Sequence, residues 1–391
     1  MTLVKAVQDC NFPLANSLIK EASQRSKNKA LLESCLHKNL EIVKLLIQNG
    51  ANVNTTNKQN ITPLHQATQK GCFEIVKYLI ENGANINNKI NPLHEAIENG
   101  HLEIVYLLLE NDANIHAMDN FNRTPLYLAS KNGYLEVFKM LLEKKADFQK
   151  TSKDNRSPLH AASENGHLEI VKLLIQNKAD INKADVFYKT PIHLAIENEH
   201  FEVVQYLVKN GADINNEDYY RKTPLYEASY CGNLEIVKLL IEKGANINKT
   251  NNFSVTPLFI ASYCGYSEVV TYLLEKGADC KLTDNYNRTP LYIAIQNGHF
   301  EIVKVLLKKN ETEILIDLFH LSCSQKSKKI AKFFLILDPM LAIQIQRRNV
   351  SSRSIIEFYE KNLVNFQFVP KQRMFESLKF KKLTDCFLQF K

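Results

Sequence analysis

The chain has 391 residues, of which 23% are charged and 45% are hydrophobic, with 12 Gly, 8 Cys and no Trp. This composition excludes a disordered, collagen-like or disulfide-scaffold chain. Lys and Arg outnumber Asp and Glu by 49 to 42, so the chain is only mildly basic. No apolar run approaches the ~20 residues of a membrane helix, and the first residues show no secretory signature. We therefore expect neither a membrane span nor secretion by the usual signal.

Proline and glycine recur at a fixed interval along most of the chain. The 12 glycines fall into two columns of one repeat, and none follows Gly298. A proline column has one step of 29 residues and then six of 33, at Pro63, Pro92, Pro125, Pro158, Pro191, Pro224, Pro257 and Pro290. Such a period predicts an array of stacked repeats, which overrides the two or three domains suggested by length.

Each repeat has the pattern of two short helices, as residues 119–150 illustrate. Thr124 is a suitable N-cap, and Pro125 fits the first helical position, where a missing N–H costs nothing. Gly133 supplies the left-handed residue that ends this helix, and a second, amphipathic helix follows. Because neither helix can bury its apolar face alone, the repeats must stack.

These residues carry a resemblance to a known family. The segments 62–65, 157–160 and 190–193 are similar to the Thr-Pro-Leu-His signature of ankyrin repeats, and the Gly-His-Leu-Glu-Ile-Val run at 166–171 matches as well. The resemblance covers about residues 30–310, with eight copies in register. It implies an all-α ankyrin-repeat solenoid of about eleven helix-turn-helix units, with β-hairpin-like turns and a helical C-terminal segment.

The sequence predicts four regions along the chain. Residues 1–58 are expected to form degenerate N-terminal capping repeats, and residues 59–312 the regular repeats. Residues 313–338 read as a degenerate C-terminal repeat, and residues 339–391 as a basic helical segment. From residue 323 onward there are 14 Lys and Arg against 5 Asp and Glu, so the net positive charge lies at this end.

Two departures from the repeat predict local irregularity. The 29-residue step removes four residues between Asn87 and Asn91, so this turn is expected to be short or missing. In three consecutive repeats the second glycine column holds Asp112, Lys145 and Lys178 instead. A non-glycine residue in a left-handed turn costs ~1 kcal/mol, so we expect the middle of the array to be looser.

Recurring histidines and cysteines have a structural interpretation. In ankyrin-like repeats, histidines at the position of His65, His94, His160 and His193 bond the neighbouring turn, and copies ~10 Å apart cannot share one metal ion. The eight cysteines form no CxxC pair, which fits reduced thiols in the cytoplasm or nucleus. The sequence has no phosphate-binding glycine loop, HExxH or GxSxG motif. We therefore expect no enzyme activity, no metal and no cofactor.

The turns and first helices between residues 219 and 292 are unusually aromatic. Exposed Tyr, Phe and Arg clusters are typical of protein-binding hot spots, so we predict a protein-binding surface here. Its predicted residues are Tyr219, Tyr220, Lys222, Tyr226, Tyr230, Phe253, Phe259, Tyr263, Tyr286, Arg288 and Tyr292. The alternative is that these rings pack between helices and that the basic residues form a solvated edge.

The sequence thus favours a monomeric, non-catalytic scaffold that binds a protein partner on the concave ankyrin surface. A first alternative is a substrate receptor of a cullin-type ubiquitin ligase, because Ser354 to Phe358, Leu363 and residues 378–391 resemble a SOCS box. That resemblance implies elongin B/C and a cullin as partners, although Tyr359 stands at the family's cysteine position. A second alternative is a nucleic-acid or acidic-surface binder that acts through the basic tail.

Overall fold

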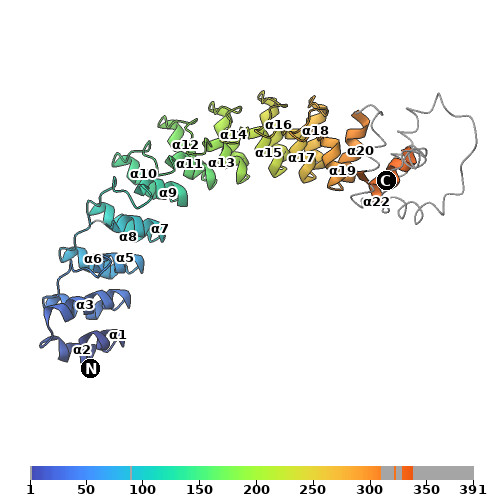
Figure 1. Cartoon of the computed structure of the whole chain (residues 1–391). Helices are drawn as coiled ribbons and strands as arrows, with labels where there is room; N and C mark the ends of the chain where they lie inside the picture. The colour runs from blue at the N-terminus through green and yellow to red at the C-terminus, as the bar shows by residue number, and fades with distance from the viewer. Residues whose placement is uncertain (1, 89, 310–320, 323–327, 338–391) are drawn as a thin grey trace, which may run out of the picture. The chain divides into compact units, whose positions relative to one another are not determined.

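The computed structural model describes residues 2–88, 90–309, 321–322 and 328–337 (Figure 1). Within these residues the chain is helical and contains no strand, which confirms the predicted all-α class. The chain divides into two compact units, Met1–Ala212 and Asp213–Lys391. None of the helices formed by the described residues is both long and apolar enough to cross a membrane.

The first unit consists of seven helix pairs. In each pair a first helix packs against a second helix, and the first helices also pack against one another along the unit. The first helices are α1 (Leu3–Gln8), α3 (Gln24–Leu36), α5 (Pro63–Gln69), α7 (Pro92–Glu98), α9 (Pro125–Asn132), α11 (Pro158–Glu164) and α13 (Pro191–Glu197). The second helices are α2 (Phe12–Ile19), α4 (Leu40–Gln48), α6 (Phe73–Glu81), α8 (Leu102–Glu110), α10 (Leu135–Glu143), α12 (Leu168–Gln176) and α14 (Phe201–Lys209).

The second unit repeats the same plan. Its first helices are α15 (Pro224–Cys231), α17 (Pro257–Cys264) and α19 (Pro290–Gln296), and its second helices are α16 (Leu234–Glu242), α18 (Ser267–Glu275) and α20 (Phe300–Lys309). Helix α22 (Lys328–Leu337) packs against α20, where the rings of Phe300 and Phe333 meet edge to face at 5.4 Å. This helix lies in the predicted degenerate repeat 313–338. The rest of that repeat, apart from residues 321–322, and the predicted segment 339–391 lie outside the described residues.

Local chemistry explains why each first helix begins and ends where it does. The Thr124 side chain accepts a hydrogen bond from the Tyr127 N–H at the start of α9, and Pro125 fills the first helical position. Gly133 ends the helix at φ 76°, in the left-handed region. A Cβ atom at Gly133 would lie 2.5 Å from the His167 ring of the next repeat, so the close approach of the repeats also requires glycine.

In the full-length repeats, the turn before a first helix is stabilised by the side chain of its first residue. In the turn at 119–123, Asp119 Oδ1 accepts the N–H groups of Phe121 and Arg123, both at 2.8 Å. Asn122 lies in the left-handed region at φ 58°. Neighbouring turns are joined by a backbone bond, such as the one from Lys153 N–H to the Phe121 carbonyl at 2.9 Å. We call these turns fingers.

The predicted irregularities are present at the expected places. The finger before α7 is four residues shorter than the next one, since Asn91, the N-cap of α7, follows Ala84 by 7 positions, whereas Thr124, the N-cap of α9, follows Ala113 by 11. Asp112, Lys145 and Lys178 all take the left-handed conformation, at φ 57°, 65° and 64°. These three residues therefore adopt the backbone geometry that glycine adopts at no steric cost in the other repeats.

Replacing the strained lysines by glycine tests this cost directly. Lys145→Gly and Lys178→Gly should each raise the free energy of unfolding by about 1 kcal/mol, because glycine relieves the left-handed strain. Lys144→Gly is the matched control, since Lys144 has φ −78° and gains nothing from glycine. Urea unfolding followed by circular dichroism measures all three. Equal effects at positions 144 and 145 would contradict the assignment of strain.

Candidate protein-binding face

The predicted aromatic surface lies within the second unit. It combines the fingers at 218–222, 251–255 and 284–288 with the side of α15, α17 and α19 that carries Tyr230 and Tyr263. We call this surface the finger–helix face, and we use the same term for the corresponding surface of the first unit. The finger turns hold the backbone of this face. In the first of them, Asp218 Oδ1 accepts the N–H groups of Tyr220 and Lys222 at 2.9 and 2.8 Å.

The predicted residues divide into an exposed and a buried set. Tyr226 and Phe259 are only 6% and 3% exposed, so the expectation that they lie on the binding surface is wrong for these two. Both are the third residue of their helix, and their rings pack into the core. Burial raises the pKa of the Tyr226 hydroxyl. Tyr292 is half-buried. The exposed aromatic side chains are Tyr219, Tyr220, Tyr230, Phe253, Tyr263 and Tyr286, with exposed fractions of 49% to 77%.

Lys222 lies among three tyrosine rings of this face. Its Nζ is 6.0, 5.7 and 5.8 Å from the ring centroids of Tyr220, Tyr226 and Tyr230. These distances are at the outer limit of cation–π attraction. The same Nζ is 3.6 Å from the carboxylate of Glu227, whose side chain is 7% exposed. Lys222 therefore links the finger to helix α15 through Glu227 and lies beside the rings.

A second basic residue supports the other end of the face. The Arg288 guanidinium lies 5.0 Å from the centroid of the Tyr286 ring and 2.6 Å from the Asp284 carboxylate. Desolvation raises the pKa of Asp284, but hydrogen bonds from the Arg288 side chain and from backbone N–H groups lower it below its ordinary value. At the first finger, Tyr219 and Tyr220 meet edge to face at 5.2 Å. The rings of Tyr219, Tyr220 and Tyr286 thus each contact another side chain of the unit.

On the corresponding surface of the first unit, glutamates near the ends of the first helices pair with basic finger residues. Arg123 contacts Glu98 at 2.5 Å, Arg156 contacts Glu164 at 3.0 Å, and Lys189 pairs with Glu197. In the second unit, the position of these glutamates on the first helix is occupied by Tyr230, Tyr263 and Gln296. Sequence reasoning found the tyrosines but missed this exchange. Aligning the last turns of the first helices with one another reveals it.

The exposed surface of the first unit also includes apolar finger residues that the predicted site does not contain. Phe121 is 62% exposed, and Val186, Phe187 and Tyr188 are 48% to 59% exposed. Tyr188 takes φ 59°, a conformation that is uncommon for a bulky residue. These side chains lie on two separate fingers, with no exposed aromatic residue on the first helices between them.

The recurring histidines hold neighbouring repeats together. His94 Nε2 lies 2.9 Å from the Arg123 carbonyl, and His160 Nε2 lies 3.2 Å from the Lys189 carbonyl. On the other side of the ring, His160 Nδ1 accepts the Ser157 N–H at 3.1 Å. Desolvation by burial lowers the pKa of His160 to about 4, so the ring is neutral at pH 7. Among the described residues, no group of His, Cys, Asp and Glu side chains is arranged to hold a metal ion.

Comparison with known proteins agrees with this geometry. A family model described as ankyrin repeats (3 copies) matches residues 3–90, 93–185, 159–251 and 248–317. The chain belongs to the ankyrin-repeat family. An ankyrin repeat protein of fowlpox virus (strain NVSL), FPV222, is 60% identical over 37 residues. This match covers 10% of the chain and 5% of the viral protein, which is about the length of one repeat.

The two alternative functions depend on a different part of the chain. The residues that resemble a SOCS box, 354–363 and 378–391, lie outside the described residues. Most of the basic residues expected to meet nucleic acid or an acidic surface lie there as well. Elongin, cullin and nucleic-acid binding therefore stay predictions from sequence.

The neutral histidines make stability depend on pH. The pKa of His160 is about 4 in the folded chain and 6.5 when unperturbed, so protonation favours unfolding. The stabilisation is fully present above pH 6.5 and is lost as pH falls through 4, by about 3 kcal/mol in total. His160→Gln keeps a donor and an acceptor without titrating, so the loss of stability between pH 6.5 and 4 should be smaller. Urea titrations at both pH values measure this, and an identical loss in both proteins would contradict it.

Proposed function

We propose that this ankyrin-repeat protein is a non-catalytic scaffold that binds a protein partner on the finger–helix face of its second unit. Ankyrin repeats form protein–protein interaction modules. One observation carries the choice of surface: six exposed aromatic rings gather on three consecutive repeats, and two of them, Tyr230 and Tyr263, occupy the first-helix position of ion-paired glutamates in the first unit. Contiguous exposed apolar surface of this kind marks interaction sites on soluble proteins.

Tyr230 and Tyr263 are the proposed centre of the interface. Each is 49% exposed, and each lies on a first helix rather than on a finger tip. The preceding residues, Ser229 and Ser262, are fully buried and donate to the Leu225 and Leu258 carbonyls at 2.7 Å, so they belong to the core side of each helix and the tyrosines to its surface. Tyrosine brings a large contact area at low cost in side-chain entropy, so a few such residues dominate the affinity of an interface.

The polar groups of the face support a binding role rather than a chemical one. Asp218 and Asp284 are buried and accept backbone N–H groups of their own fingers. Glu227 pairs with Lys222. These carboxylates are therefore committed to holding the surface in shape. Among the described residues, no disulfide joins Cys10, Cys35, Cys72, Cys231, Cys264 or Cys280, which supports a location in the cytoplasm or nucleus.

Exchanging the tyrosines for the residues of the first unit tests the proposal. Tyr230→Glu with Tyr263→Glu should weaken partner capture by at least about tenfold, because the aromatic area is lost. A glutamate at position 230 would lie near Lys222, as Glu197 lies near Lys189, so the melting temperature should change little. Affinity purification of the tagged full chain, with quantitative mass spectrometry of the captured proteins, measures the effect.

The matched control replaces the same two residues by phenylalanine. Tyr230→Phe with Tyr263→Phe keeps the ring area and should retain most of the captured partner. If the glutamate variant folds normally and captures the same partners in the same amounts as the original chain, the finger–helix face of the second unit is not the binding surface.

A further inference from the structure

The second helices of the second unit carry a groove that arises from two small residues. The first position of a second helix in the regular array is Leu or Phe, for example Leu168, Phe201 and Leu234, but α18 begins with Ser267. The fifth position is most often Lys, as in α12 and α16, but α18 has Thr271. The Thr271 hydroxyl turns back onto its own helix and donates to the Ser267 carbonyl at 2.8 Å. On α18, the two large side chains that cover this surface in other repeats are therefore replaced by the smaller Ser267 and Thr271.

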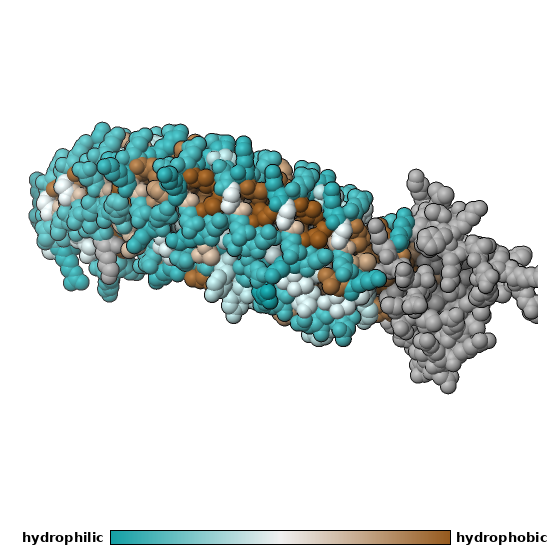
Figure 2. Space-filling view, turned by 90° about the horizontal axis from the view of Figure 1, so that it is seen from above, coloured by the Kyte–Doolittle hydropathy of each residue, from teal (hydrophilic) through white to brown (hydrophobic). Residues whose placement is uncertain are grey.

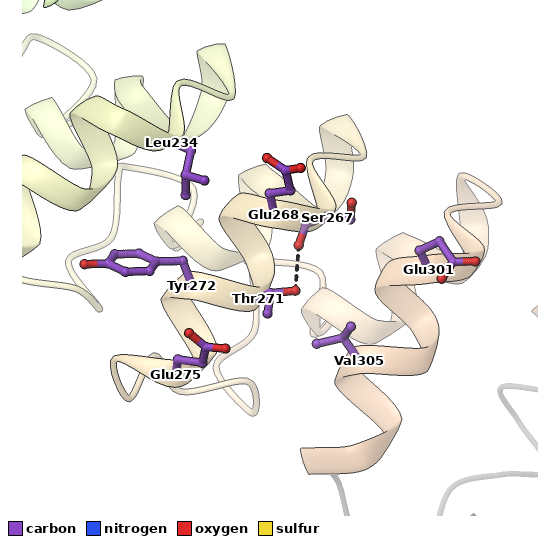
Figure 3. Close-up of a pocket in the computed structure, with 8 residues that line it drawn as sticks. All are labelled: Leu234, Ser267, Glu268, Thr271, Tyr272, Glu275, Glu301 and Val305. Atoms are coloured by element: carbon purple, nitrogen blue, oxygen red, sulfur yellow. Dashed lines mark hydrogen bonds between the residues drawn. The ribbon is translucent and has the colours of Figure 1, made fainter. Parts of the chain in front are cut away.

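The resulting groove runs over α16, α18 and α20 and has a volume of about 440 Å³ (Figure 3). Its apolar side chains are Leu234 from α16, Tyr272 from α18 and Val305 from α20. Helices α16 and α18 lie above α15 and α17 in Figure 1, and Figure 2, seen from above, shows apolar residues breaking the hydrophilic surface of this side. The groove thus lies on the second helices, whereas the finger–helix face lies on the first helices.

The charge of the groove is acidic. Three glutamates, Glu268, Glu275 and Glu301, contribute to its lining, and the nearest cation to its aromatic ring is Lys276, whose Nζ lies 5.4 Å from the centroid of Tyr272. In other second helices the glutamate at the second position pairs with the lysine three residues later, as Glu136 does with Lys139 at 2.8 Å and Glu169 does with Lys172 at 2.7 Å. Thr271 removes this lysine from α18. Within the groove, Glu301 pairs with Lys304, while Glu268 lacks the lysine of its counterparts.

We propose that this groove docks an arginine-bearing segment of a second protein partner. Separate guanidinium groups of the segment would pair with Glu268 and with Glu275, which lie about two helical turns apart on α18 (Figure 3). The aliphatic stem and a neighbouring apolar side chain would cover Leu234 and Val305. Because the two surfaces use different helices of the same repeats, one chain can hold two partners at once. The protein then acts as an adaptor that brings them together.

A labelled hexapeptide of alternating Leu and Arg, with a hexapeptide of alternating Leu and Glu as comparison, is a suitable probe for fluorescence anisotropy on the full chain. The Leu–Arg peptide should bind, and added salt should weaken it. Ser267→Phe with Thr271→Gln copies the residues of α14, Phe201 and Gln205, so the helix keeps a sequence that this fold already uses. The pair fills the groove without changing its charge and should weaken binding by at least about tenfold.

Two further variants make the outcome decisive. Leu102→Phe with Tyr106→Gln places the same residues at the same positions of α8, also without a change of charge, and should leave binding unchanged. Tyr230→Glu with Tyr263→Glu should also leave it unchanged, which separates this proposal from the function of the finger–helix face. Equal binding to the original chain and the Ser267→Phe, Thr271→Gln variant would overturn the proposal. So would equal binding of the two peptides, or no binding of the Leu–Arg peptide.

Discussion

Burial of helix faces between neighbouring repeats is the constraint on which this structure depends. A second helix such as α12 buries Ile170, Val171 and Leu174, but it can do so only against the helices of its own and adjacent repeats. The ring of His167 over Gly133, and the bonds from histidine rings to the next finger, bring successive repeats into this close contact. Stability in such arrays is therefore a sum of contacts between neighbours, and the remaining surface is free to vary.

The two units use that freedom differently on equivalent positions. In the first unit, glutamates on the first helices form ion pairs with basic finger residues. In the second unit, Tyr230 and Tyr263 occupy those positions, and Lys222 lies among aromatic rings. The same first-helix position thus holds an ion-paired glutamate in three repeats of the first unit and an exposed tyrosine in two repeats of the second. This contrast supports binding in the second unit more strongly than exposure alone does.

Local features of this fold could be predicted from the sequence, whereas features that depend on packing could not. The caps at Thr124 and the left-handed positions at Lys145 and Lys178 follow from short-range rules, and the structure confirms them. Tyr226 and Tyr230 lie four residues apart on one helix, so the sequence pattern assigns both to the same side. Only the neighbouring helices decide that Tyr226 is buried and Tyr230 is exposed. The groove at Ser267 and Thr271 was missed because its signal appears only when the second helices are compared with one another.

Site-specific photo-crosslinking tests the central claim most directly. A photoreactive phenylalanine analogue is placed in the full chain at position 263, and at position 197 as the equivalent site of the first unit. We predict that position 263 yields one discrete crosslinked protein. Excess unlabelled original chain should compete with this crosslink, whereas excess of the Tyr230→Glu, Tyr263→Glu chain should not. Crosslinking of equal strength from position 197, or equal competition by both chains, would contradict the assignment of partner binding to the aromatic face.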